Sequence, residues 1–153
     1  MGRIRLGARS INWLNRWELY AFGSAFFAGL TAILGKLGVA GVNSNLATFI
    51  RTLVIIAVTA VILFIRDEWR KPGSIPATTW LFLTLSGIAT GLSWLCYYRA
   101  LQLGPVTKVA PIDKLSVVFA ILLGVLFLGE HLTWQLAVGG SLIVLGSLVM
   151  VLF

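Results

Sequence analysis

Five apolar stretches, each about as long as a lipid bilayer is thick, constrain this chain more than any other feature of its sequence. A transmembrane helix needs roughly 20 mostly apolar residues, and 59% of the residues here are hydrophobic while 11% are charged. A water-soluble domain of this size requires no such composition. We therefore expect an all-α integral membrane protein, a bundle of five transmembrane helices over residues 17–37, 45–65, 79–100, 106–128 and 133–153.

The connections between these stretches are short, so the chain has a simple organisation. We expect a basic tail over residues 1–16 and a single transmembrane domain over residues 17–153. Pro72, Gly73 and Pro76 interrupt the longest connection. The first apolar stretch is too long for the core of a secretory signal peptide and is interpreted as a transmembrane helix.

Basic residues are distributed unequally between the two sides of the expected bundle. On one side lie Arg3, Arg5, Arg9, Arg16, Arg66, Arg70 and Lys71. On the other lie Lys36, Arg99 and Lys108. The positive-inside rule then predicts a cytoplasmic amino terminus and an external carboxyl terminus in the cytoplasmic (inner) membrane of the cell. Because these residues flank apolar spans and form no soluble basic face, we expect membrane lipid as a partner and no nucleic acid.

Small residues four positions apart are typical of helix contacts in membranes, because they let two backbones approach closely. The third stretch carries Gly87 and Gly91, and the fourth carries Ser116, Ala120 and Gly124. These rows are predicted to serve packing within the bundle or contact between subunits.

A row of hydroxyl-bearing residues follows one face of the third stretch. Ser86, Thr90, Ser93 and Tyr97 recur at helical spacing and fall on the same side of a helix. This face is predicted to line a water-filled cavity. The alternative is that the Ser and Thr hydroxyls bond to carbonyls of their own helix and need no water.

Asp113 and Lys114 lie side by side near the start of the fourth stretch, where an ionised group is costly unless it is partnered or hydrated. Adjacent helix positions point about 100° apart, so we do not expect these two to pair readily with each other. Antiparallel threading places Arg51 and Arg99 at the same membrane face, where either could neutralise Asp113. With Lys36, this charged layer has four cations and one carboxylate, which favours an anionic substrate group near Lys114.

Pro111 leaves two structures open for this region. Proline suits the first position of a helix, in which case Asp113 would lie in the first turn, where the helix dipole favours a carboxylate. Pro111 equally fits a broken helix whose freed Thr107 carbonyl contributes to a site.

No catalytic or cofactor signature accompanies these charges. Glu130, at the turn into the fifth stretch, is interpreted as a surface or capping carboxylate, and His131 is too isolated for a metal cluster. We find no nucleophile and base pairing, phosphate-binding loop or cofactor motif. We therefore expect no enzymatic activity, no cofactor and no metal.

Four segments carry a resemblance to a known family: residues 97–101 (YYRAL), 109–115 (VAPIDKL), 126–130 (LFLGE) and 139–146. In order and spacing they resemble the EamA family of the drug/metabolite transporter superfamily. Larger members have ten helices, arranged as two five-helix repeats of opposite orientation around a central cavity. The resemblance implies that this chain is equivalent to one repeat.

The resemblance also implies a partner and a set of cavity residues. The chain would pair as a homodimer, or as a heterodimer with another short transporter chain, to enclose the pathway. Arg51, Tyr97, Asp113 and Lys114 would then face or flank the cavity.

The leading hypothesis is a secondary transporter of a small polar or amphipathic metabolite that works by alternating access. Lys114 and Arg51 would hold an anionic group of the substrate, Asp113 would couple transport to protons, and Tyr97 would shape the site. The alternatives are a small multidrug or lipid-carrier exporter and a non-transporting membrane assembly subunit. The candidate binding or translocation residues are Lys114, Asp113, Arg51, Tyr97, Arg99, Ser93 and Thr90.

Overall fold

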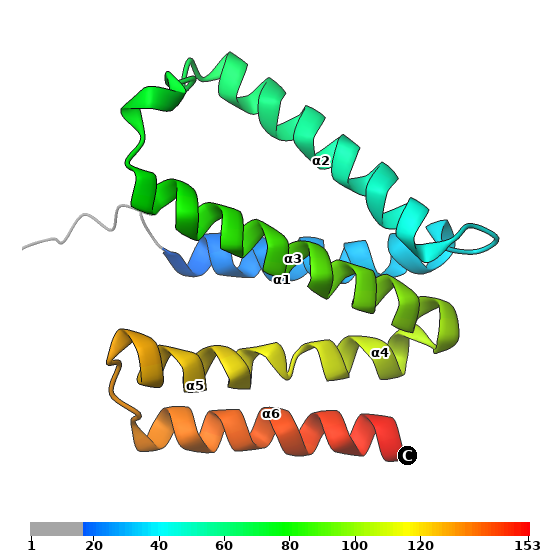
Figure 1. Cartoon of the computed structure of the whole chain (residues 1–153). Coiled ribbons are helices and arrows are strands. Elements are labelled where there is room, and N and C mark those ends of the chain that lie inside the picture. Colours follow the sequence, from blue (N-terminus) through cyan, green and yellow to red (C-terminus); the bar gives the residue numbers. More distant parts are fainter. Residues whose placement is uncertain (1–16) are drawn as a thin grey trace, which may run out of the picture. The chain divides into compact units, whose positions relative to one another are not determined.

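The computed structural model describes residues 17–153 (Figure 1). The expected basic tail, residues 1–16, lies outside the described residues. The helices are α1 (Trp17–Gly38), α2 (Ser44–Ile65), the short 3₁₀ helix η2 (Pro72–Ser74), α3 (Ala77–Leu103), α4 (Val106–Asp113), α5 (Ser116–Leu128) and α6 (Trp134–Leu152).

Five spans of this structure are long and apolar enough to cross a membrane. The helices α1, α2, α3 and α6 each provide one span, and α4 and α5 together provide the fourth, Val106–Leu128. The described residues contain no β-strand. The predicted fold class, an all-α membrane protein with five transmembrane helices, is confirmed.

The chain divides into two compact units at Thr31, inside α1. In the first unit, residues 17–31 are helical throughout, and the rings of Phe26 and Phe27 meet edge to face with centroids 5.5 Å apart. The second unit, residues 32–153, holds the end of α1 and all the other helices. Every site described below lies in this second unit.

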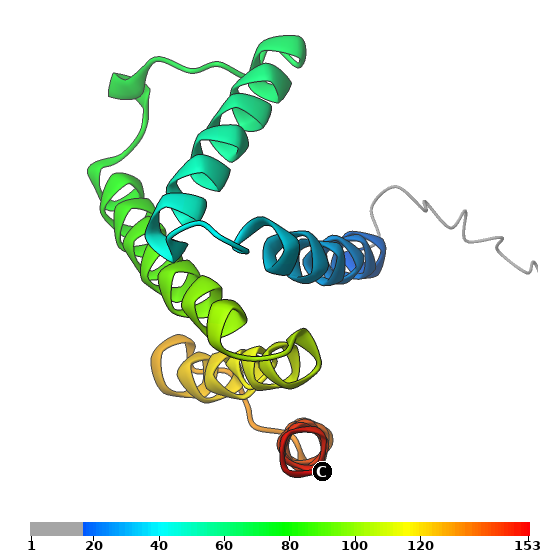
Figure 2. The same ribbon diagram turned by 90° about the vertical axis from the view of Figure 1, so that its right-hand side faces the viewer.

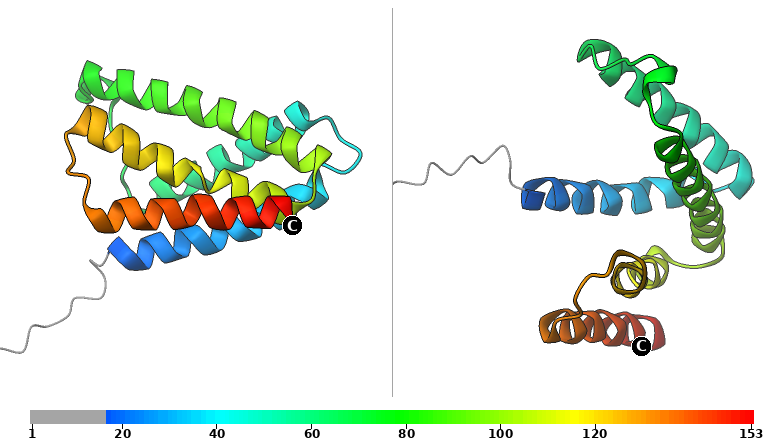
Figure 3. Two further views of the ribbon diagram at one scale, coloured as in Figure 1. Left: turned by 90° about the horizontal axis from the view of Figure 1, so that it is seen from below. Right: turned by 60° about the vertical axis from the view of Figure 1, so that its left-hand side comes forward.

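Each helix of the second unit from α2 to α6 packs against one or two other helices. Helix α2 packs against α3, α3 packs against α4, and α6 runs along both α4 and α5 (Figures 2 and 3). The connections between successive helices are short, and short connections favour antiparallel neighbours. One end of the unit therefore gathers the end of α1, the start of α2, the end of α3 and the start of α4.

The best-packed part of the second unit lies at this end. Leu101 is fully buried, and Val39 and Tyr98 are nearly so. Gly35 permits this packing, because a Cβ at that position would lie 3.4 Å from both the Leu101 side chain and the Tyr98 hydroxyl. Elsewhere most large apolar side chains are exposed, as expected where helices contact lipid or a further chain.

Polar side chains bind the loop and helix-end carbonyls at the same end. Lys36 Nζ donates hydrogen bonds to the carbonyls of Leu101 and, at 2.9 Å, Gly104. Gln102 Nε2 donates to the carbonyl of Val42 at 2.6 Å. The last carbonyls of a helix lack partners within it, so Lys36 satisfies the end of α3. Lys36 was expected in the charged layer; the structure gives it this packing role.

The fourth span has the expected limits but consists of two helices. Helix α4 ends at Asp113 and α5 begins at Ser116. Pro111 lies inside α4, which begins at Val106, so Pro111 does not occupy the first helical position. Of the two alternatives that the sequence left open, the structure has the broken helix.

The break follows Pro111 by three residues. Pro111 has no N–H, and its ring disfavours a regular helix around it. The hydrogen bonds that follow tighten from the α-helical to the 3₁₀ spacing: the N–H of Leu115 bonds to the carbonyl of Ile112 at 3.0 Å, and that of Val117 bonds to Lys114 at 3.1 Å. The backbone therefore changes its winding over Lys114 and Leu115.

Helix α6 binds α4 at this proline and one turn before it. The Ser147 hydroxyl donates a hydrogen bond to the Pro111 carbonyl at 2.9 Å, and Ser147 is 4% exposed. Lys108 Nζ donates to the carbonyl of Val151, near the end of α6, at 2.9 Å. Two hydrogen bonds between α4 and α6 thus join the helix that precedes the break to a neighbouring span.

Candidate functional site

A pocket of about 260 Å³ opens between α3 and α4. It contains three of the predicted site residues, Ser93, Tyr97 and Asp113. Ligand sites commonly combine a few polar groups with apolar walls, and this pocket has two hydroxyls and one carboxylate. The rest of its lining is Cys96, Ala100, Val109 and Ile112.

Asp113 and Lys114 form an ion pair, which corrects the expectation that they would not readily pair. Lys114 Nζ lies 3.4 Å from Asp113 Oδ2. That expectation assumed a continuous helix, whereas α4 ends at Asp113 and the long lysine stem reaches back from the break. The side chains are 55% exposed for Lys114 and 37% exposed for Asp113. Both groups are accessible at the surface of the described chain, so a solute can reach them.

Arg51 is held by aromatic rings of α3. Its guanidinium carbon lies 3.7 Å from the centroid of the Trp94 ring and 5.5 Å from that of Tyr98. A stacked guanidinium retains donors on its edge that fit a carboxylate or phosphate. The sequence analysis missed Trp94 and Tyr98 as partners of Arg51, although their spacing of four puts both on one face of a helix.

Tyr97 connects the pocket with Arg51. Its ring meets that of Tyr98 edge-on, with centroids 6.5 Å apart, and it lines the pocket beside Asp113. The Tyr98 ring in turn lies under the Arg51 guanidinium, 5.5 Å from its carbon. Tyr97 therefore belongs to one polar neighbourhood with a carboxylate and a guanidinium.

Arg99 and Thr90, two further predicted site residues, do not line this pocket. Arg99 Nη1 donates to Gln102 Oε1 at 3.1 Å. The Thr90 hydroxyl donates to the Ser86 carbonyl of its own helix at 2.9 Å, which is the alternative weighed for these hydroxyls. Of the hydroxyl row, Ser93 and Tyr97 face the pocket.

Residues predicted for helix packing have different surroundings. A Cβ added at Gly87 or Gly91 would meet nothing within 4 Å, so this face of α3 is uncovered. Gly124 is buried, and a Cβ there would lie 2.9 Å from Glu130 Oε2. Ala120 lines a groove beside α5 together with Gly124, whereas Ser116 is exposed.

The pocket has few groups that ligate metals. Asp113 is the one carboxylate and Cys96 the one thiol in its lining. Within residues 17–153, no three His, Cys, Asp or Glu side chains gather in a way that could hold a metal ion. The polar groups of the pocket suit hydrogen bonding and charge pairing with an organic solute.

Comparison with known proteins gives the family. Residues 15–152 match the EamA-like transporter family. A protein of Sinorhizobium sp, described as an uncharacterized transporter in the cobO 3' region, is 52% identical over 137 residues, covering 90% of this chain and 97% of the relative. No solved structure matches the chain.

The family match agrees with the five apolar spans and accounts for a site without catalytic groups. A family of transporters points to a transporter rather than an enzyme. The spans Trp17–Gly38 to Trp134–Leu152 make the chain a multi-pass membrane protein. The chain belongs to the EamA-like transporter family and is a membrane transporter.

Proposed function

We propose that this protein is a secondary transporter that moves a small polar or amphipathic metabolite with an anionic group by alternating access. The observation that carries the proposal is the pocket between α3 and α4, where Ser93, Tyr97 and Asp113 meet. Arg51, stacked on Trp94, supplies a cation to the same neighbourhood.

In this mechanism the Asp113 and Lys114 ion pair exchanges partners. The carboxylate or phosphate of the substrate displaces Asp113 from Lys114, because both side chains are accessible at the surface of the chain. Asp113, without its cation, then takes up a proton, and Arg51 binds the substrate anion through its edge donors. Substrate binding and proton uptake are thereby coupled through one ammonium group.

The break between α4 and α5 provides the moving part. Discontinuous helices place substrate and ion sites near the middle of many transporters. Here the charged pair lies at the end of α4, and α5 begins after it. A change in the angle between the two helices opens the pocket to one side of the membrane or the other.

A second chain completes the pathway in this proposal. The pocket is lined by α3 and α4 alone, and many large apolar side chains are exposed. Gly87 and Gly91 leave one face of α3 open to a close helix contact. The partner is another copy or a related short transporter chain. This chain lies in the inner membrane with its amino terminus in the cytoplasm.

Uptake into proteoliposomes tests the proposal. Purified protein is reconstituted and assayed with pools of labelled organic acids, amino acids and phosphorylated metabolites, with and without a proton gradient. Substrate-dependent flux is expected for the wild type and loss of flux for Lys114→Ala. Asp113→Asn is expected to abolish the response to the proton gradient and to retain downhill exchange.

The same assay separates the alternatives. The matched control is Lys71→Ala, which removes an exposed lysine in the connection before α3. Unchanged flux in both site variants would remove these residues from the mechanism. Absence of flux from every pool would favour a non-transporting assembly subunit, and flux confined to lipophilic drugs or lipid carriers would favour an exporter of those compounds.

A further inference from the structure

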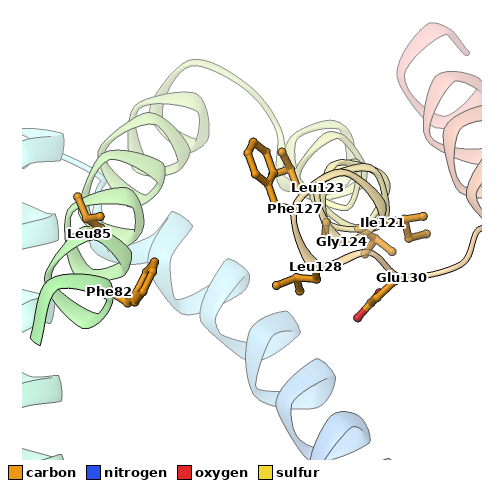
Figure 4. Close-up of a pocket in the computed structure, with 10 residues that line it drawn as sticks. Phe82, Leu85, Ile121, Leu123, Gly124, Phe127, Leu128 and Glu130 are labelled. Carbon is orange, nitrogen blue, oxygen red and sulfur yellow. The ribbon is translucent and has the colours of Figure 1, made fainter. Parts of the chain in front are cut away.

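A second cavity, a groove of about 960 Å³, lies between α3 and α5 and is separate from the pocket described above (Figure 4). Phe82 and Leu85 of α3 face it from one side, and Phe127 and Leu128 of α5 face it from the other. Its single charged lining group is Glu130, at one end. The groove therefore presents an apolar surface with one carboxylate.

The turn after α5 positions the Glu130 carboxylate. Gly129 ends α5 in the left-handed conformation, with a φ of 67°, which glycine adopts without strain. The N–H of Glu130 then bonds to the Gly124 carbonyl at 3.2 Å. The chain turns back over the last turns of α5, and the Glu130 side chain lies against Gly124.

Gly124 leaves the space that the carboxylate occupies. A Cβ at this position would lie 2.9 Å from Glu130 Oε2 and 3.4 Å from its Cδ. Any other residue would push the carboxylate out of this place. Within residues 17–153, no lysine, arginine or histidine forms an ion pair with Glu130; the ion pairs there join Arg66 to Glu68 and Lys114 to Asp113.

The dimensions of the groove match one leaflet of a bilayer. On α5 it extends from Val117 to Leu128, a rise of about 16 Å at 1.5 Å per residue, against about 15 Å for half of the hydrocarbon core. Glu130 follows the end of the span and Trp134 begins the next one. The Glu130 carboxylate reaches back to Gly124, about 6 Å inside the end of α5 at 1.5 Å per residue, so it lies just below the level of the lipid headgroups.

We propose that this groove binds a phospholipid with an ammonium headgroup, whose acyl chain lies along α3 and α5 and whose ammonium pairs with Glu130. The charge argues for this occupant, because the carboxylate lacks a cation in the described chain. The length of the groove also favours this lipid, because an acyl chain of one leaflet fills the apolar part of the groove. Phosphatidylglycerol has the same phosphate but a neutral glycerol in place of the ammonium, so it forms no ion pair with Glu130.

Native mass spectrometry of the protein released from bilayer nanodiscs tests this inference. The nanodiscs contain equal amounts of phosphatidylethanolamine and phosphatidylglycerol with identical acyl chains. The wild type is expected to retain phosphatidylethanolamine in preference, although the net charge of +7 attracts the anionic lipid. Glu130→Gln, which keeps the shape and removes the charge, is expected to lower the ratio of retained lipids about threefold, as for an exposed ion pair.

Two further variants make the result specific. Gly124→Ala is expected to lower the ratio as well, because its Cβ displaces the carboxylate. Gly139→Ala is the matched control, since a Cβ there meets nothing within 4 Å, and it should keep the wild-type ratio. If Gly124→Ala does not fold, the lipid ratio of Glu130→Gln alone decides the test.

Three outcomes would overturn the inference. One is a wild type without preference for phosphatidylethanolamine, and another is a preference that Glu130→Gln leaves unchanged. The third is a wild-type spectrum of dimers without bound lipid, which would assign the groove to a second copy of the chain.

Discussion

The Ser147 hydroxyl on α6 donates a 2.9 Å hydrogen bond to the Pro111 carbonyl on α4. This bond joins the one proline inside a helix of the described chain to a neighbouring span. The N–H of Leu115, four residues after Pro111, bonds to Ile112 instead. The Pro111 carbonyl therefore accepts two hydrogen bonds, one from the Ser147 hydroxyl and one from the Lys114 N–H at 3.2 Å.

Replacing Ser147 by alanine is expected to destabilise the break. The variant removes one of the two donors to the Pro111 carbonyl, which keeps the Lys114 N–H at 3.2 Å, so the expected cost is that of one hydrogen bond, about 1 kcal/mol. Thermal unfolding in detergent, followed by circular dichroism, should show a lower midpoint. Ser141→Ala is the control on the same helix, because the Ser141 hydroxyl is exposed and bonds to its own helix at Ala137. Equal midpoints for the two variants would contradict the role assigned to Ser147.

The spans were predictable because they depend on local composition. Each apolar stretch is long enough on its own to cross a bilayer, and the five spans of the structure correspond to five stretches of the sequence. Pro111 left two structures open, a helix that begins at the proline and a broken helix. The sequence could not decide between them, since that depends on which carbonyls find partners on other helices.

The site was predictable in part, for the same reason. Helical spacing put Ser93 and Tyr97 on one face, and the structure places both in the pocket with Asp113. No local pattern predicts the bond between Ser147 and Pro111, because 36 positions separate them. The stacking of Arg51 on Trp94 likewise depends on how α2 packs against α3.

Replacing Arg51 by lysine is expected to weaken substrate binding while the positive charge remains. Lysine loses both the planar stacking on Trp94 and the edge donors that fit a carboxylate. Loss of one hydrogen bond to the substrate, about 1 kcal/mol, corresponds to about a fivefold increase in the substrate concentration for half-maximal uptake. Uptake into proteoliposomes measures this concentration. Arg99→Lys is the control, because Arg99 contacts Gln102 outside the pocket, and a similar increase there would show that the effect is unspecific.

Cys96 offers a direct probe of the pocket. It is the single cysteine of the chain, it is exposed, and it lines the pocket with Tyr97 and Asp113. A charged methanethiosulfonate reagent should therefore label the unmodified protein at one position and inhibit uptake. A saturating concentration of substrate is expected to slow labelling several-fold. Cys96→Ser should transport and resist the reagent; a labelling rate that substrate does not alter would place substrate outside this pocket.

Replacing Lys36 by alanine is expected to affect folding rather than transport chemistry. The variant leaves the carbonyls of Leu101 and Gly104 without their donor, which costs about 1–3 kcal/mol. The unfolding midpoint should fall, whereas the half-saturation concentration for uptake by the folded protein should stay at the wild-type value, because Lys36 does not line the pocket. Lys71→Ala, at an exposed loop position, should change neither quantity. A weaker affinity at an unchanged midpoint would return Lys36 to the charged layer that contacts substrate, and would mean that its hydrogen bonds at the end of α3 are replaceable by water.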